Sequence, residues 1–239
     1  MTKKYDKKKY ISINDSLIEF AKMLSATGHC TMSQAKKNLT NHQIDQMNRA
    51  GLINFTSVDT SKKRIRELYK NGIIDKETHD KELKSARASV EGISFSKRGR
   101  NFCGKHLGLK DMYSAPNSLL HNLQLTCKFQ TLTKEERDSV KTESQVRKEL
   151  KAEILNFKKA EPLKYREIQI KYNNKFENFI EIQEKKHEFG SPSDFVYHSS
   201  ATQTWHSYEV ITKSYKEFDI VLKEFSAEIL GYNLEMVKV

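Results

Sequence analysis

Two acidic residues on neighbouring short apolar segments are the best candidates in this sequence for a catalytic or metal-binding site. Asp194 opens the segment DFVYH, Glu209 lies within QTWHSYEVIT, and 14 residues separate them. Carboxylates are preferred ligands of hard divalent cations such as Mg²⁺, which polarise a phosphate and activate a water molecule. The pair therefore raises the hypothesis of metal-dependent cleavage of nucleic acid.

A lysine follows the second carboxylate, but its position is unusual for such a site. Side chains alternate along a strand, so Glu209, Ile211 and Lys213 share one face, with Lys213 a further ~7 Å along the strand from Ile211. Ile211 is then a poor neighbour for a hydrated cation. The alternative is structural, with Asp194 capping a turn and Lys213 lying on the surface at a strand end.

The elements that must position these residues can be read from the C-terminal half. DFVYH and QTWHSYEVIT predict two strands, YKEFDIVLKEFSAEILGY a helix and NLEMVKV a closing strand. Upstream, SAPNSLLHNLQLTCKFQTL predicts an apolar helix, in which we expect His121 to be structural. An amphipathic helix with Glu143 near its start follows, and KYREIQIKYNNKFENFIEIQEKK leaves its element boundaries open.

This order of elements is similar to the core of the PD-(D/E)XK nuclease superfamily. Pro192-Ser-Asp194 resembles its "PD" with one extra residue, and the resemblance implies that Asp194 and Glu209 bind Mg²⁺. It also implies a lysine two residues after the glutamate, where this sequence has Ile211. On this reading the catalytic residues are Asp194, Glu209 and Lys213, the metal ligands are Glu143, Asp194 and Glu209, and Mg²⁺ is the cofactor. Otherwise we expect no cofactor.

The excess positive charge of the chain lies entirely in its N-terminal half. Residues 1–110 contain 23 Lys and Arg against 11 Asp and Glu, a net charge of +12, whereas residues 111–239 contain 19 against 20. One strongly basic half indicates a polyanionic partner for that half. Double-stranded DNA is the leading candidate, because neutralising its phosphates releases counterions.

The helical pattern of this basic half matches that expectation. Three helices are predicted within SLIEFAKMLSAT, TMSQAKKNL and NHQIDQMNRAGLI, followed by the strand LINFTSV and a returning strand from Gly92. The order, with "RAGLINF" after the third helix and Ser96, Lys97 and Gly99 after the returning strand, resembles a winged helix-turn-helix. In such folds the third helix enters the major groove. The residues expected to contact DNA are His42, Gln43, Gln46, Arg49, Lys62, Lys63, Arg64, Arg66, Lys97, Arg98 and Arg100.

A helical insertion separates the two strands of the wing, at residues 61–90. Its segment RELYKNGIIDKETHDKELKSA is similar to the short helical hairpin called SHOCT, with matches at Leu68, Gly72, Ile73, Ile74 and Lys81. It either lengthens the wing as a solvated helical pair or serves self-association.

The composition of the chain restricts the fold classes and cellular compartments to consider. Only 9 Gly and 3 Pro favour a helix-rich fold, and no run approaches the ~20 apolar residues of a membrane span. Cys30, Cys103 and Cys127 are odd in number and far apart, which fits a reducing cytoplasm. Neither His29–Cys30 nor Cys103–His106 forms a paired pattern of zinc ligands.

Together these features resemble the replication-relaxation family of plasmids and mobile elements. "LLHNLQL" is similar to its "H-L" helix and "TESQVRKEL" to its "tE..lR" helix. We predict an α+β, helix-rich fold with a basic arm (1–12), a winged helix domain (13–110) and a degenerate, restriction-endonuclease-like domain (111–239). The expected function is sequence-specific DNA binding in regulation, replication or DNA transfer of a mobile element. An endonuclease and a protein-binding adaptor are the alternatives. A homodimer is left open, and no membrane or small-molecule partner is indicated.

Overall fold

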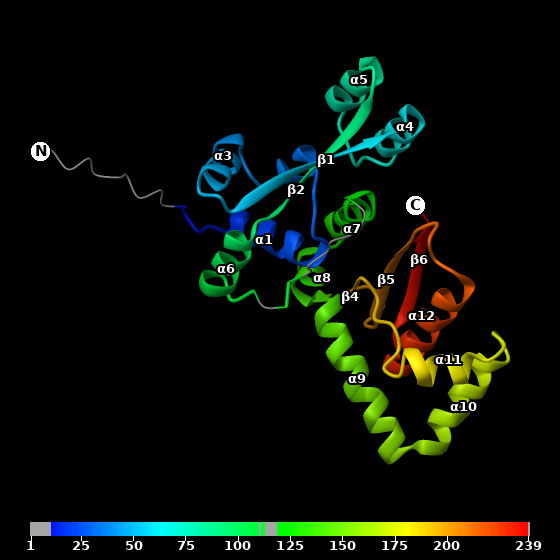
Figure 1. The fold of residues 1–239 in the computed structure, drawn as a ribbon. Coiled ribbons are helices and arrows are strands. Elements are labelled where there is room, and N and C mark those ends of the chain that lie inside the picture. The colour runs from blue at the N-terminus through cyan, green and yellow to red at the C-terminus, as the bar shows by residue number, and fades with distance from the viewer. Residues whose placement is uncertain (1–10, 110, 113–118, 239) are drawn as a thin grey trace, which may run out of the picture. The chain divides into compact units, whose positions relative to one another are not determined.

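The computed structural model describes residues 11–109, 111–112 and 119–238, and it is an α+β, helix-rich fold with two small sheets (Figure 1). Two compact units result: an N-terminal unit, up to Leu24 with Gly28–Lys110, and a C-terminal unit, Ser25–Thr27 with Asp111–Val239. Most of the expected basic arm, residues 1–12, lies outside the described residues. In the described part of the chain, no helix is long and apolar enough to cross a bilayer.

Three capped helices open the N-terminal unit, and they confirm the three predicted from the sequence. They are α1 (Asp15–Thr27), α2 (Met32–Ala35) and α3 (Asn41–Arg49). Asn14 caps α1 through its side chain, and Thr31 and Thr40 form capping boxes on α2 and α3. These caps satisfy backbone N–H groups that have no partner inside a helix.

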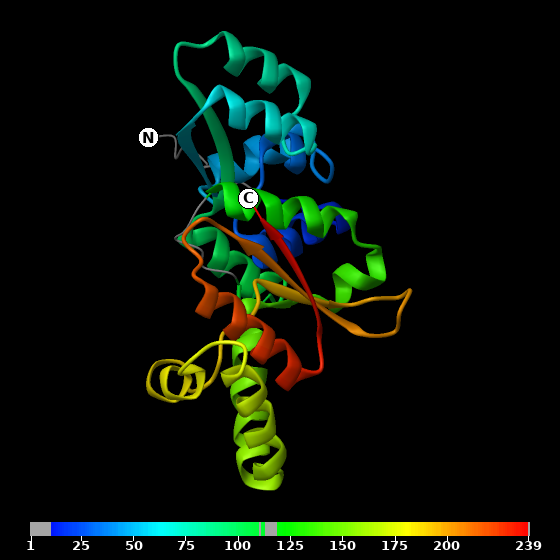
Figure 2. The same ribbon diagram turned by 90° about the vertical axis from the view of Figure 1, so that its right-hand side faces the viewer.

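An antiparallel hairpin follows, formed by β1 (Ile53–Thr60) and β2 (Ala88–Phe95). β2 therefore begins four residues before the predicted start at Gly92, because its register with β1 runs from Ile53↔Phe95 to Thr60↔Ala88. The insertion between the strands is a pair of helices, α4 (Lys62–Lys70) and α5 (Lys76–Lys84), which lie side by side at the far end of the hairpin (Figure 2).

A further helix, α6 (Lys97–His106), follows the returning strand and was not predicted from the sequence. Ser96 caps it, since its Oγ accepts from the N–H of Gly99 at 2.9 Å and donates to the carbonyl of Gly51 at 2.6 Å. A Cβ on Gly99 would lie 1.9 Å from the carbonyl oxygen of Leu52. Glycine is therefore required where α6 passes the start of β1.

A four-stranded sheet forms the centre of the C-terminal unit, in the order β3-β4-β5-β6. The strands are β3 (Lys141–Thr142), β4 (Phe195–His198), β5 (Trp205–Ile211) and β6 (Asn233–Lys238). β3, β4 and β5 pair antiparallel, and β6 runs parallel to β5 after the helix α12 (Glu217–Leu230). The two predicted strands, the helix and the closing strand are all present.

Five further helices complete this unit: α7 (Leu119–Thr131), α8 (Lys134–Ser139), α9 (Glu143–Ala160), α10 (Pro162–Asn173) and α11 (Phe179–Lys186). The segment whose boundaries the sequence left open forms α10 and α11. Tyr172, Phe179 and Phe225 pack their rings together in the core between α9–α11 and α12.

Candidate functional site

Asp194 and Glu209, the two candidate carboxylates, lie close together in the C-terminal unit. Asp194 directly precedes β4, and Glu209 lies within the neighbouring strand β5. The backbone N–H of Asp194 donates to Oε2 of Glu209 at 3.0 Å, and Oδ2 of Asp194 accepts from the N–H of Val210 at 2.8 Å. Both side chains are buried, with exposed fractions of 6% for Asp194 and 0% for Glu209.

Two basic side chains pair with these carboxylates, and a phenol donates a hydrogen bond to one of them. Nζ of Lys223, on α12, lies 2.8 Å from Oε1 of Glu209, and Nε2 of His121, on α7, lies 3.1 Å from Oδ2 of Asp194. The Tyr215 hydroxyl donates to Oε1 of Glu209 at 2.5 Å. We call Asp194, Glu209, Lys223, His121 and Tyr215 the carboxylate cluster. Asp194 directly precedes β4, Glu209 lies on β5, Tyr215 lies between β5 and α12, and Lys223 and His121 lie on α12 and α7, so the fold of the unit positions all of them.

Burial and charge shift the proton affinity of two members. Burial raises the pKa of Glu209 to about 6, against the opposing attraction of Lys223 and with a further increase from Asp194. Burial by itself lowers the pKa of His121, but its hydrogen bond to Asp194 and the charges of both carboxylates raise it above the ordinary histidine value. Both groups therefore hold a proton more tightly than in water.

The lysine that reaches the carboxylates is Lys223, and not the expected Lys213. Lys213 lies in the exposed turn after β5, which ends at Ile211. Lys223 is 8% exposed, and its ammonium also donates to the carbonyl of Pro192 at 2.5 Å. The sequence offers one weak sign that Lys223 is buried, which is its place among the apolar residues of α12. The sign is weak because a lysine stem often covers apolar surface while its ammonium stays in water.

Glu143, the third proposed metal ligand, starts α9, where its carboxylate pairs with Arg147 at 2.6 Å. In the described ranges, no group of three or more His, Cys, Asp or Glu is arranged to hold a metal ion. As the cluster stands, the positive charge beside Glu209 is the ammonium of Lys223. The residues would fit Mg²⁺ only if the ion displaced that ammonium. Without such a displacement, the cluster is a structural network in which ion pairs and hydrogen bonds neutralise the buried carboxylates.

The expected nucleic-acid contacts of α3 lie on its outward face. His42 and Arg49 are exposed, and Gln46 is partly exposed, whereas Ile44 and Met47 are buried. Gln43 already serves the helix itself: its Oε1 accepts from the N–H of Thr40 at 2.9 Å. The outward face of α3 therefore presents a mixed set of hydrogen-bond donors and acceptors, with the positive charge of Arg49 and the negative charge of the exposed Asp45.

The remaining predicted contacts lie on the insertion and on α6. Lys62, Lys63 and Arg66 are exposed along α4, whereas Arg64 is partly buried and pairs with Glu67 at 3.0 Å. Lys97, Arg98 and Arg100 belong to the first turn of α6 and are also exposed. The guanidinium of Arg100 donates to the carbonyl of Phe95 at 3.0 Å, so one of its N–H donors is already used inside the unit.

Comparison with protein-family models, with curated proteins and with solved structures finds no match to this chain. The functional conclusions below therefore rest on its own residues.

Proposed function

We propose that this protein binds double-stranded DNA through its N-terminal unit, which we interpret as a winged helix with a helical insertion in the wing. The observation that carries the proposal is the concentration of charge: a net +12 in residues 1–110 coincides with the order of three short helices and a strand hairpin. Charge supplies sequence-independent affinity, and base edges are read by side chains presented in the groove.

The surface of α3 supports this interpretation. Its inward residues, Ile44 and Met47, are anchored in the core, so the helix has one fixed outward face. His42, Gln46 and Arg49 on that face have the hydrogen-bonding groups that read purine edges and phosphates. The exposed cations of α4 and α6 would then contact the backbone and set orientation.

The proposed biological setting is regulation, replication or DNA transfer of a plasmid, phage or other mobile element. It is drawn from the resemblance to the replication-relaxation family, and the C-terminal unit then serves DNA, partner or self-association in a nuclease-like frame. The neutralised carboxylate cluster favours this non-catalytic role, because Lys223 and His121 already satisfy the buried acidic pair.

The test is a salt series of binding measurements on a duplex library, followed by footprinting of the selected site. We expect steep salt dependence, and we expect Arg49→Ala combined with Lys97→Ala to weaken binding at least tenfold. The matched control is Lys186→Ala with Lys213→Ala, which removes the same charge from exposed sites of the C-terminal unit. Equal losses in both variants, or affinity no greater than that of a neutral protein, would overturn the proposal.

A metal-dependent endonuclease is the second candidate, and one observation favours it. Asp194, Glu209 and a lysine do meet within hydrogen-bonding distance, with Lys223 in the place assigned to Lys213. Incubation of supercoiled plasmid with Mg²⁺ or Mn²⁺ tests it. Nicking that is abolished by Asp194→Asn and by Lys223→Met, but unaffected by Lys213→Ala, supports this candidate; no nicking by the folded protein rejects it.

A further inference from the structure

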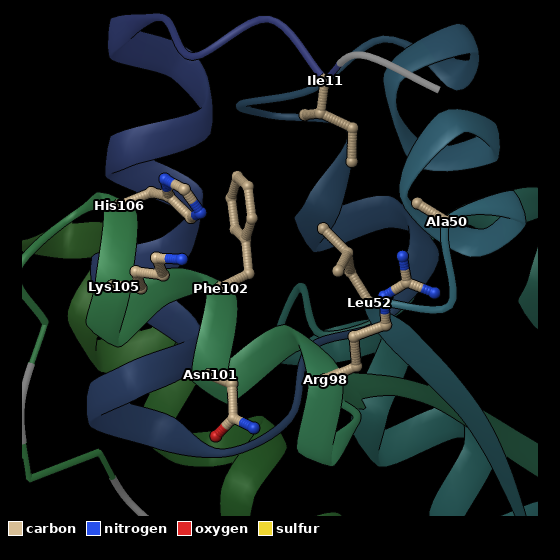
Figure 3. A pocket seen from close by; sticks show the side chains of 8 residues that line it. All are labelled: Ile11, Ala50, Leu52, Arg98, Asn101, Phe102, Lys105 and His106. Atoms are coloured by element: carbon tan, nitrogen blue, oxygen red, sulfur yellow. The ribbon is translucent and has the colours of Figure 1, made fainter. Parts of the chain in front are cut away.

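A pocket of about 320 Å³ lies in the N-terminal unit between α6, the start of β1 and the end of α3 (Figure 3). Its centre is apolar: Leu52 and Phe102 contribute side chains to it, and Ile11 points toward Phe102 from the opposite side. The volume suits a small organic ligand, since ligand pockets begin at about 300 Å³.

The rim of the pocket is basic. Arg98 and Lys105, both from α6, border the apolar centre, and no acidic residue is among the described residues that line it. Within the described part of the chain, neither cation forms an ion pair. The imidazole of His106 also lies at the rim, and its ring packs against Phe102 with the two centroids 4.9 Å apart.

The spacing along α6 explains how charge and apolar surface meet at one place. Arg98, Phe102 and Lys105 stand four and three residues apart, so they share one face of the helix. Gly99 and Cys103 are buried on another face and hold α6 against the unit. The face that lines the pocket is therefore held in position by the buried face, and core side chains do not occupy the pocket.

We propose that this pocket binds a small organic acid, an aromatic or similarly bulky apolar body carrying a carboxylate. The guanidinium of Arg98 would take the carboxylate in a paired hydrogen bond, a geometry that suits arginine. The apolar body would lie against Phe102 and Leu52, and Lys105 would add positive potential at the other end of the face. The absence of acidic lining residues among those described favours an anion over a cation.

This site does not depend on DNA binding, although it adjoins the proposed reading helix. Ala50, the C-terminal cap of α3, and Leu52, at the entrance to β1, both line the pocket. An occupant would therefore stiffen the junction between α3 and the strand hairpin. Binding of the acid is measured without DNA, so its failure and the failure of the proposed function are separate results.

The experiment is calorimetric titration of the full chain with 2-naphthoate, 2-naphthamide and acetate. We expect 2-naphthoate to bind, and both other compounds to bind at least tenfold more weakly, since one lacks the charge and the other lacks the apolar body. Arg98→Gln should weaken 2-naphthoate binding about tenfold. Lys97→Gln is the matched control, because it removes the same charge from the neighbouring exposed residue outside the pocket.

Four outcomes would overturn the assignment. They are naphthamide binding as tightly as naphthoate, acetate binding as tightly as naphthoate, an equal loss in Lys97→Gln and Arg98→Gln, and no detectable binding of 2-naphthoate at millimolar concentration. Circular dichroism of each variant checks that the exposed substitutions leave the fold intact.

Discussion

In the C-terminal unit several basic side chains pair with carboxylates on other elements. Among the residues that the structure describes in the N-terminal unit, by contrast, Lys62, Lys63 and Arg66 are exposed and form no ion pair. Lys128 pairs with Glu235, Lys171 with Glu228 and Lys223 with Glu209, each across two elements. In the N-terminal unit the pairs Lys22–Glu19 and Arg64–Glu67 join residues only three apart.

The contrast follows from the charge balance of the two halves. With 19 basic and 20 acidic residues, positions 111–239 can neutralise themselves, whereas 23 against 11 in positions 1–110 leaves a surplus. Surplus charge contributes little to stability and creates a field that attracts polyanions. The same residue types therefore form internal ion pairs in one unit and leave a positive surplus in the other.

The largest expected effect is the loss of the buried pair. Lys223→Met leaves the fully buried Glu209 without its cation, and we expect a loss of about 3–5 kcal/mol in the free energy of unfolding of the C-terminal unit. Urea denaturation followed by Trp205 fluorescence measures it. Adding Glu209→Gln to Lys223→Met should recover much of the loss. A double variant no more stable than the single would show that packing, and not charge, is responsible.

The N-terminal unit depends instead on close backbone packing at α6. Gly99→Ala forces its Cβ to 1.9 Å from the carbonyl oxygen of Leu52, and we expect a loss of about 2–4 kcal/mol through displacement of α6 from β1. Gly104→Ala is the control, since its Cβ would lie 3.6 Å from the nearest atom, the carbonyl oxygen of Leu109. That change should be neutral or stabilise by up to ~1 kcal/mol. Thermal denaturation of both variants distinguishes the two sites.

The carboxylate cluster predicts that the C-terminal unit is more stable at mildly acidic pH. The folded pKa of Glu209, about 6, exceeds its ordinary 4.5, so its stabilising protonation is complete below pH 4.5 and lost as pH rises through 6. His121, whose pKa is also raised, loses its contribution above pH 6.5. The protonation of Glu209 therefore contributes ~2 kcal/mol to the free energy of unfolding at low pH, from the rise of its pKa from 4.5 to about 6.

Urea titrations between pH 4.5 and 8 measure this dependence. The double variant Glu209→Gln with Lys223→Met should lose the decline between pH 4.5 and 6 and keep the part above 6.5 that comes from His121. A stability that rises over this range in the unmodified protein would contradict the prediction.

The smallest expected effect on stability comes from the exposed cations of the insertion. Replacing Lys62, Lys63 and Arg66 together by glutamine should change the unfolding free energy by no more than ~0.5 kcal/mol. The slope of log affinity for DNA against log salt should nevertheless fall by about 2 to 3. Lys159, Lys186 and Lys213, exposed in the C-terminal unit, form the matched triple control. An unchanged slope would restrict DNA contact to α3 and α6.

Local signals accounted for the elements that were predicted correctly. Asn14, Thr31 and Thr40 cap the three predicted helices of the N-terminal unit, and such a capping interaction involves only residues within one helical turn. The short apolar segments DFVYH and QTWHSYEVIT likewise located β4 and β5 to within two residues. α6 was missed even though Ser96 caps it, since Gly99 and the run of charges weaken its helical pattern.

The sequence by itself indicated the α+β, helix-rich fold and the uneven charge of the two halves, and it singled out Asp194 and Glu209 as candidate site residues. Tertiary structure alone decided that Lys223, and not Lys213, neutralises Glu209, since that contact joins a strand to a helix that packs from elsewhere in the unit. It also decided the pocket beside α6, whose walls come from three separate segments. Periodicity and capping act between neighbours in the chain, whereas a buried ion pair or a pocket depends on which elements meet after folding.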